Sequence, residues 1–485
     1  MKITPARLAM LLGPWSASGG PLYAALAGAL RSAISRGELP DQTVLPPERE
    51  LAKRLHVSRT TVVGAYGALK EEGVLASRQG RGTWVVGPSA PTPSSDLAFS
   101  GELFSDLMGG RGDVVELSAA APLPTSVVAE ELARATGDGL AARVVGSGYL
   151  PGGLPELREG IAELHSAQGL PTRPDEVLVT TGAQQAIGLV TALLGEAGQS
   201  VLVEEATYPG ALDLARGAGM RPVGIPLDED GLVVDAMADL LERVRPRFVY
   251  LVPVFQNPTG SVLPEARSRA VAELSARYRI PVVEDLALRD LRMSDRAVPA
   301  PIAAHDPEAL VITIGSMSKL FWAGLRVGWI RAPRPVIERL MRLKIVADMG
   351  GAVLSQVIAA ASLPRIDEAT AERREGLIAG HAALAGALSR RVPEWTWETP
   401  PGGCILWVRI PRGDAREFAQ VAQRYGVSVV PGQALSADGG HADRLRLPFV
   451  HEAAVLEEAA RRLGLAWELY SGGRSGTEAM ASIIV

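Results

Sequence analysis

The chain has 485 residues, of which 47% are hydrophobic and 21% are charged, and these are values of folded domains rather than of disordered chains. Its length predicts two or three domains, and no apolar run reaches the roughly 18 residues that a membrane span needs. Cys404 is the only cysteine, which excludes a disulfide within the chain, and the few histidines show no zinc spacing. We therefore expect a cytoplasmic protein with no metal site and no membrane anchor.

Charge is distributed unevenly along the chain. The net charge is −5, but residues 1–86 carry 11 basic and 6 acidic side chains, whereas the remainder carries 38 and 48. A basic head on an acidic body suggests that the head binds an anionic partner. Many solvated domains carry such an excess without a partner, so the charge alone decides nothing.

The first stretches of the chain predict helices. "MKITPARLAMLLGPW" has the spacing of a short amphipathic helix and lacks the long apolar core of a signal peptide. A helix from Leu22 to Gly37 and a short helix in "PPERELAKRLHV" follow, and a third helix begins after the capping residue Ser58 and stops at Gly73. The side chains expected on the buried faces of these three helices are Leu22, Leu26, Leu30, Ala33, Ile34, Leu51, Leu55, Val62, Val63, Tyr66 and Leu69.

A hairpin completes the head. "VLASRQGRGTWVV" predicts two strands joined by a Gly-rich turn. Three helices and a hairpin predict a winged helix-turn-helix, whose third helix enters the major groove of DNA by its N-terminal end. Arg59 could address a guanine edge there, while the hydroxyls of Ser58, Thr60 and Thr61 suit phosphates. The residue pattern leaves open a three-helix adaptor domain with a solvated basic face.

The remainder of the chain predicts a linker and an α/β body. "GPSAPTPSSD" has no helix or strand period, so we expect a linker over residues 87–112. Strand-like runs such as "EVLVTTG", "SVLVEEATYP", "RFVYLVP" and "IPVVED" then alternate with helical stretches, which predicts a mostly parallel sheet covered on both faces. From about residue 375 a long helix leads to "GGCILWVRI", "RYGVSVVPG" and "RLRLPFV", which predict a smaller α+β subdomain. The body is expected over residues 113–470, and residues 471–485 are expected to form a loose tail.

The head motifs resemble a known family. "LPPERELAKRLHVSRTTVVGAYGALKEEGVL" and "RQGRGTWV" are similar to the DNA-binding domain of the GntR family of bacterial regulators. The resemblance favours the DNA-binding interpretation over the adaptor. It implies that the chain contacts a double-stranded DNA operator through Arg49, Ser58, Arg59, Thr60 and Thr61, with Arg81 and Gly82 in the wing near the minor groove.

The body carries residue types that suit a phosphate-bearing aldehyde. In "GSMSKLFWAGLRVGW", Lys319 can form an imine, and Ser316, Ser318 and Arg326 can bind a phosphate. Asp285 ends the apolar run "IPVVED", where a carboxylate can pair with a protonated pyridine nitrogen. Asn257 in "NPTG" can donate to a phenolate, Tyr208 in "ATYPG" can stack on a ring, and "TTGAQQAIG" predicts a helix N-terminus that suits phosphate. A single lysine is more often a loop residue, so the order of all these motifs carries the inference.

In this order the motifs resemble the fold-type I aminotransferases, which bind pyridoxal 5'-phosphate (PLP). The resemblance implies a large parallel-sheet domain, a small domain, and a homodimer whose active sites are shared. It makes Lys319 the lysine that bonds PLP, places Asp285 at the pyridine nitrogen, Asn257 at the phenolate and Tyr208 on the ring face, and assigns the phosphate cup to Ala183, Gln184, Ser316, Ser318 and Arg326. It also assigns Tyr149 to the partner subunit's phosphate. Arg446 would hold a substrate carboxylate, with Arg444 as a close competitor.

A GntR head joined to an aminotransferase-like body resembles the MocR/GabR subfamily of regulators, whose effectors are PLP itself or a small amine or amino acid. Two departures from the aminotransferase pattern matter. Ala287 and Leu288 stand where a tyrosine often follows the aspartate, and Ala323 stands where proline is usual. The first removes a contact to the phenolate, which argues for at most weak or half-reaction transaminase activity. The alternatives are a working aminotransferase with an accessory head, and a repressor whose body is a dimerisation scaffold without cofactor.

Overall fold

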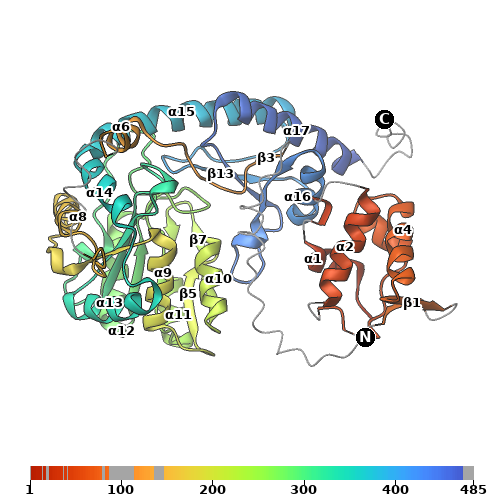
Figure 1. The fold of residues 1–485 in the computed structure, drawn as a ribbon, viewed down its shortest axis with the longest axis horizontal. Helices are drawn as coiled ribbons and strands as arrows, with labels where there is room; N and C mark the ends of the chain where they lie inside the picture. The colour runs from red at the N-terminus through yellow and green to blue at the C-terminus, as the bar shows by residue number, and fades with distance from the viewer. Residues whose placement is uncertain are drawn as a thin grey trace.

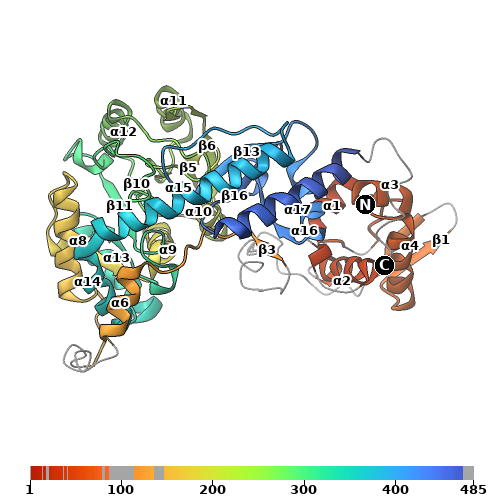
Figure 2. The same cartoon turned by 90° about the horizontal axis from the view of Figure 1, so that it is seen from above.

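The computed structural model describes residues 2–13, 15–17, 21–35, 38–40, 42–78, 82–86, 114–135 and 147–472. They form a helical head, a large domain built on one sheet, and a small subdomain between them (Figure 1). Two long helices, α15 (Ile366–Arg391) and α17 (Ala453–Gly472), run side by side along the body, and α17 ends near the head (Figure 2). No helix in the described ranges is both long and apolar enough to cross a membrane.

The head is the winged helix-turn-helix that the sequence predicts. Its core is formed by the inner faces of its helices, and the hydroxyl of Tyr66 donates to the Pro46 carbonyl at 3.0 Å. Ser58 caps the third helix, because its Oγ accepts from the Thr61 N–H at 3.1 Å, a contact of about 1 kcal/mol. The elements are α1 (Pro5–Leu12), η1 (Trp15–Ala17), α2 (Leu22–Ser35), α3 (Glu48–Arg54), α4 (Arg59–Glu71), β1 (Leu75–Arg78) and β2 (Gly82–Val85).

Two residues that were predicted to lie in the core of the head are exposed instead, so these two predictions are wrong. Val63 is 45% exposed, because the buried stripe of α4 is completed by Ala65, and Val63 lies about 100° around the helix from Val62. Leu22 is 36% exposed, since it is the first residue of α2 and borders an open surface hollow beside Thr60, Thr61 and Gly64 of α4. The predicted end of that helix at Gly37 falls outside the described residues.

The large domain is built on a seven-stranded sheet of order β4-β12-β11-β10-β9-β5-β6. All neighbouring strands are parallel except β12, which runs antiparallel to both of its neighbours. The predicted mostly parallel sheet is therefore confirmed. The strands are β4 (Val177–Thr180), β5 (Ser200–Glu204), β6 (Arg221–Ile225), β9 (Val249–Leu251), β10 (Val282–Asp285), β11 (Val311–Ser316) and β12 (Gly328–Arg331), and a small hairpin pairs β7 (Leu227–Asp228) with β8 (Gly231–Leu232).

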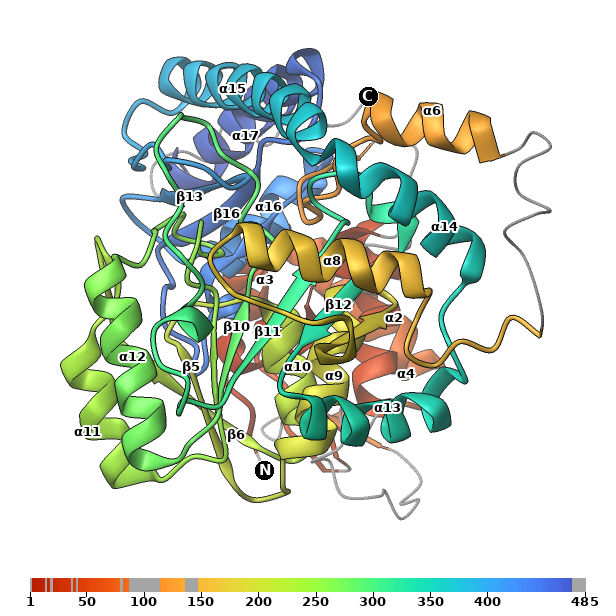
Figure 3. The same cartoon turned by 90° about the vertical axis from the view of Figure 1, so that its left-hand side faces the viewer.

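Helices cover both faces of this sheet (Figure 3). Alternate strand residues enter different apolar clusters: Val203 and Val283 join the main core, whereas Leu202 and Val282 join a second cluster under α11 and α12. This alternation is the period of two that a strand imposes on its side chains. The remaining elements of the large domain are α6 (Ser126–Ala135), α8 (Pro155–Ala167), η3 (Pro174–Glu176), α9 (Gly182–Leu194), α10 (Pro209–Gly217), α11 (Val234–Val244), α12 (Glu265–Tyr278), η4 (Ile302–Ala304), η5 (Ala323–Leu325), α13 (Arg334–Asp348), α14 (Val353–Ser362) and η6 (Leu363–Arg365).

The small subdomain has the α+β character predicted from about residue 375. Its antiparallel sheet has the order β13-β16-β15, and α15 and α17 pack together beside it. A strand from the start of the body, β3 (Val115–Glu116), pairs in parallel with β14, which the sequence did not indicate. Its elements are β13 (Ile405–Arg409), α16 (Ala415–Arg424), β14 (Val427–Ser428), β15 (Val430–Pro431), η7 (Gly432–Leu435), β16 (Arg444–Pro448) and the two long helices.

Candidate functional site

The predicted cofactor lysine lies just beyond the end of β11. The ammonium of Lys319 donates to the Ala120 carbonyl at 2.6 Å, which ties it to the segment that precedes α6. Burial lowers the pKa of the Lys319 amine, and the nearby guanidinium groups of Arg446 and Arg326 lower it further. A lysine whose pKa is lowered has a larger share of the neutral amine that attacks an aldehyde.

The predicted pyridine partner ends a neighbouring strand. Asp285 is buried at the carboxyl end of β10, where Oδ1 accepts from the Ala287 N–H at 2.9 Å and Oδ2 accepts from the Tyr250 hydroxyl at 2.8 Å. Burial raises the pKa of the Asp285 carboxyl, while these two hydrogen bonds and the charge of Lys319 oppose that rise. A cation on a bound ring would favour the ionised carboxylate in the same way.

The residues around the start of α9 fit a phosphate group. Arg326 reaches this helix end and donates to the Thr181 carbonyl at 3.0 Å, and the Ser318 N–H donates to Ser316 Oγ at 3.2 Å. The buried Ser318 hydroxyl has no hydrogen-bond partner within the described part of the chain. Ala183 and Gln184 supply backbone N–H groups in the first turn, where a helix leaves such donors free for an anion.

Close backbone approach explains the glycines of this cup. Gly182 has a φ of +80°, and a Cβ there would come within 2.9 Å of Arg326 Nη2. A Cβ on Gly328 would come within 2.9 Å or less of the backbone at residues 182–183. A side chain at residue 182 would therefore displace the arginine, and one at residue 328 would push the start of α9 away from β12.

Tyr208 is tied to the same cup. It is the residue before α10, and its hydroxyl donates to Gln184 Oε1 at 2.9 Å. The Gln184 amide in turn donates to the Gly210 carbonyl at 3.3 Å. The ring expected to stack on the cofactor is thus held by a residue of the turn that is expected to bind phosphate.

Of the two arginines that competed for the carboxylate role, the structure places one at the site. Arg446 is buried on β16, where its Nε donates to Asn257 Oδ1 at 3.1 Å and its Nη1 donates to the Ser118 carbonyl at 2.9 Å. Arg444 lies two residues earlier and lines an outer cleft of about 1140 Å³ between the large domain and the small subdomain. Arg446 is therefore brought together with Asn257, and Arg444 is not.

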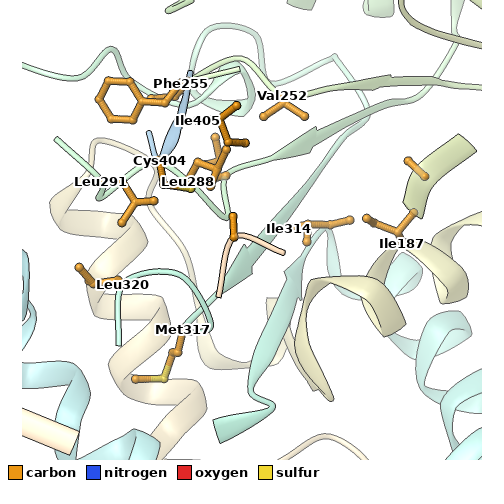
Figure 4. Packing of buried hydrophobic residues seen from close by; sticks show 14 of the residues in the cluster. Ile187, Val252, Phe255, Leu288, Leu291, Ile314, Met317, Leu320, Cys404 and Ile405 are labelled. Carbon is orange, nitrogen blue, oxygen red and sulfur yellow. The ribbon is translucent and has the colours of Figure 1, made fainter. Parts of the chain in front are cut away.

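The position of the missing tyrosine is filled by a buried apolar side chain. Leu288 packs with Phe255, Leu291 and the small-subdomain residues Cys404 and Ile405 (Figure 4). A hydroxyl there would need a partner inside this cluster. The tyrosine that does contact Asp285 comes from β9, and the polar tip of Tyr250 within the apolar run "RFVYLVP" is the only sequence signal that could have indicated it.

Within residues 147–472, the Tyr149 side chain makes no hydrogen bond to the cup of its own chain. It is 64% exposed, and the adjoining Leu150 backbone lies against Gly350, just after α13. Val346 on that helix is 89% exposed, and further exposed apolar side chains lie on α13, after it and on α14: Ile345, Met349 and Leu354. This group, Tyr149 with Ile345, Val346, Met349 and Leu354, is named the apolar face.

Most of the residues expected to contact DNA are exposed on the head. Arg49, Arg59 and Thr60 are exposed, as is Gly82 at the start of β2 with a φ of +83°. Ser58 Oγ is within 2.6 Å of the Thr60 hydroxyl and 2.8 Å of the Thr61 hydroxyl, so Ser58 serves the helix cap as well as the surface. Arg81 lies outside the described residues.

The head docks on the small subdomain of the same chain, which the sequence did not indicate. Arg424 on α16 donates to the carbonyls of His56 at 2.7 Å and Leu55 at 3.4 Å, at the end of α3. Glu417 on α16 pairs with Arg54 at 2.6 Å. Two further contacts join the parts: Gln420 donates to the carbonyls of Gly13 and Ala9, and the His56 ring lies 5.0 Å from the Tyr470 ring.

Comparison with known proteins shows that the body and the head each match a protein family. Residues 113–463 match the family described as "Aminotransferase class I and II", and residues 22–85 match "Bacterial regulatory proteins, gntR family". The chain is 30% identical to the "Uncharacterized HTH-type transcriptional regulator YisV" of Bacillus subtilis over 94% of its length and 99% of that protein. It is 30% identical to the "Probable rhizopine catabolism regulatory protein MocR" of Rhizobium meliloti, with 85% and 86% covered.

Among solved structures, the fold is similar to LysN, the alpha-aminoadipate aminotransferase of Thermus thermophilus, in complex with N-(5'-phosphopyridoxyl)-L-leucine. The TM-score is 0.69 at 31% identity, and the alignment covers 76% of this chain and 95% of that chain. Together these matches confirm both resemblances that the motifs indicated, and with them the predicted fold class.

Proposed function

Because this chain belongs to the aminotransferase class I and II family and carries a gntR-family domain at its head, we propose that it is a transcription regulator whose body binds PLP and a small amine or amino acid. One observation carries the proposal: Lys319, Asp285 and Arg326, which the resemblance assigns to the cofactor, occur in one chain with an exposed helix suited to DNA. We propose that the protein acts in the cytoplasm, where it can bind the operator DNA.

Different residues of the body are proposed to bind different parts of PLP. When bound, PLP supplies an aldehyde for an amine and a ring that accepts electrons. Lys319 provides the amine, Asp285 pairs with the pyridine nitrogen, and Tyr208 covers the ring face. Asn257 is oriented toward the phenolate by the Arg446 contact to its Oδ1. The phosphate is received by the start of α9 with Ser316, Ser318 and Arg326, and the unpartnered Ser318 hydroxyl in this cup supports that assignment.

Arg446 is proposed to bind the carboxylate of an amino-acid effector. Its guanidinium already makes two hydrogen bonds, to Asn257 and to Ser118, which fix its plane and leave further N–H donors for a ligand. Ser118 belongs to the body's first segment, and Arg446 belongs to the small subdomain. A ligand held by Arg446 therefore acts on the subdomain that carries the head.

The active form is proposed to be a homodimer. The apolar face exposes Val346 almost entirely, and such faces on folded domains mark interaction sites. Tyr149 borders this face, which suits its assignment to the partner subunit's phosphate. Two heads on one dimer would bind two half-sites of an operator, and the second contact would be strengthened by the first.

The proposal is tested by colour, by chemical trapping and by DNA binding in the full chain. Purified protein loaded with PLP should absorb near the visible edge, and after borohydride reduction mass spectrometry should find the pyridoxyl group on Lys319. Lys319→Ala should lose this label and the response of operator binding to effector, yet still bind DNA. The exposed Lys53→Ala, tested for the label alone, should retain it. Absence of bound PLP in the parent protein, or a label on another lysine, would refute the cofactor assignment.

A working aminotransferase is the second candidate, because the lysine, aspartate and arginine positions are all filled and the structural neighbour LysN is an aminotransferase at 31% identity. The two candidates differ in turnover. Addition of amino acids should change the spectrum of the regulator with little keto acid released. Steady production of keto acid at ordinary enzyme rates, about 1–10³ per second, would establish the aminotransferase instead.

A further inference from the structure

A buried tyrosine on β9 contacts the aspartate proposed for the pyridine nitrogen. β9 and β10 are parallel neighbours in which Tyr250 lies opposite Val283. Asp285 is two residues beyond Val283, so its side chain is on the same face of the sheet. The Tyr250 hydroxyl reaches one pleat forward and donates to Asp285 Oδ2 at 2.8 Å, with both residues buried.

This contact completes the hydrogen bonding of the carboxylate from the protein side. Oδ1 accepts from the Ala287 N–H and Oδ2 accepts from Tyr250, so the carboxylate cannot rotate without losing one of them. Each oxygen retains a lone pair for a further donor. Burial raises the pKa of Tyr250 well above its ordinary value, so this hydroxyl keeps its proton and acts as a donor at every working pH.

A second buried carboxylate beside β9 already has its own hydrogen-bond donors, so it does not depend on the Tyr250 hydroxyl. Glu204, at the end of β5 on the other side of β9, accepts from the Val252 N–H, Gln256 and Thr207. The only hydrogen bond described for the Tyr250 hydroxyl within residues 147–472 is the one to Asp285. A phenylalanine would fill the same apolar volume, so a hydroxyl at this place needs a reason beyond packing.

We propose that Tyr250 is a positioning residue of the cofactor site, which fixes the Asp285 carboxylate toward the pyridine nitrogen through a hydrogen bond from the neighbouring strand. The inference rests on the proposed binding of PLP. It concerns the nitrogen end of the ring, opposite the phenolate whose usual tyrosine contact is lost at Ala287 and Leu288. Tyr250 therefore holds the Asp285 carboxylate in place and favours its ionised form at the ring nitrogen, while the phenolate has lost a donor.

The test compares Tyr250→Phe with the parent and with Tyr278→Phe, a control tyrosine on α12. All three are purified as full chains and loaded with PLP. The loss of a hydrogen bond to a charged group should weaken PLP affinity about tenfold or more. With less positive charge held on the ring, the nitrogen that joins Lys319 to the cofactor should keep its proton to higher pH. The pH midpoint of the visible absorbance should therefore rise in Tyr250→Phe and stay unchanged in Tyr278→Phe.

A double-mutant cycle separates positioning from a general structural effect. In an Asp285→Asn background the Tyr250→Phe change should have little further effect on affinity or midpoint, because the group it acts through is already neutral. Equal effects in both backgrounds, or a Tyr250→Phe protein that matches the parent in both readouts, would overturn the inference and leave PLP binding intact. A parent protein that takes up no PLP would overturn the proposed function and this inference together.

Discussion

The buried carboxyl of Glu204 should make the stability of the body depend on pH. Glu204 ends β5 in full burial, where Oε2 accepts from the Val252 N–H at 3.1 Å, from the Gln256 amide at 3.1 Å and from the Thr207 hydroxyl at 3.3 Å. Burial raises the pKa of this carboxyl from 4.5 to about 8, and the three hydrogen bonds only partly offset the rise. Replacement of Glu204 by glutamine keeps the size and an acceptor oxygen and removes the titration.

The sign follows from which state binds the proton more tightly. The folded protein holds the Glu204 proton up to about pH 8, whereas the unfolded chain releases it near 4.5, so protonation stabilises the fold below 4.5 and this contribution is lost as pH rises through 8. At about 1.4 kcal/mol per pH unit, with the slope falling off close to pH 8, the parent should lose roughly 3.5 kcal/mol from this group between pH 5 and pH 8. For a body of about 350 residues, with about 2.1 cal/mol/K of unfolding entropy per residue, that loss corresponds to roughly 5 °C in Tm.

The assay is thermal unfolding of cofactor-free protein, followed by circular dichroism between pH 5 and pH 8. The Tm of the parent should fall over this range by about 5 °C more than that of Glu204→Gln. Glu205→Gln is the matched control, because Glu205 is adjacent in sequence and only partly buried, and its profile should follow the parent. Parallel profiles for the parent and Glu204→Gln would show that Glu204 is ionised in the folded protein at neutral pH, which would refute the reasoning.

Three further substitutions probe DNA binding, assembly and docking. Arg59→Ala should weaken specific operator binding about 5- to 150-fold in a gel-shift titration without changing PLP uptake, and parent-like affinity would exclude Arg59 from base contacts. Val346→Asp should shift the proposed dimer toward monomer in sedimentation at micromolar concentration, whereas Val455→Asp on α17 should not. An unshifted Val346→Asp would contradict the assignment of the dimer interface to the apolar face. Arg424→Ala should release the head, so small-angle X-ray scattering should give a larger maximum dimension while circular dichroism keeps the helical signal; an unchanged dimension would mean that the contact with α16 does not hold the head.

The periodicity of the sequence predicted those elements that depend only on residues nearby in the chain. The capping of α4 by Ser58 and the alternation of strands with helices follow from neighbouring residues, and the structure has both as expected. The faces of the head helices were less predictable, because Val63 and Ala65 are both apolar and only tertiary contacts decide which one is buried. Tyr250 could not be assigned from spacing, since its partner Asp285 lies 35 residues away and the two meet only through strand pairing.

The contact between the head and the body could not be predicted from the sequence, for a different reason. Arg424 and Gln420 bind backbone carbonyls of the head, at His56, Leu55, Gly13 and Ala9. Every residue has a carbonyl, so no residue type in the head could indicate these contacts. Only the side chains on α16 carried a signal, and arginine and glutamine on a helix surface are common.

Docking through carbonyls has a consequence for how such a protein can change its DNA target. Four of the hydrogen bonds that hold the head are made to atoms that no substitution removes, and Arg59 and Thr60, at the start of α4, stay exposed while they are made. The residues proposed to select an operator can therefore change over generations without disturbing the attachment to the body. The same property makes the head a candidate for engineering, in which the first turn of α4 is exchanged for that of another regulator and the proposed response to a ligand should be kept.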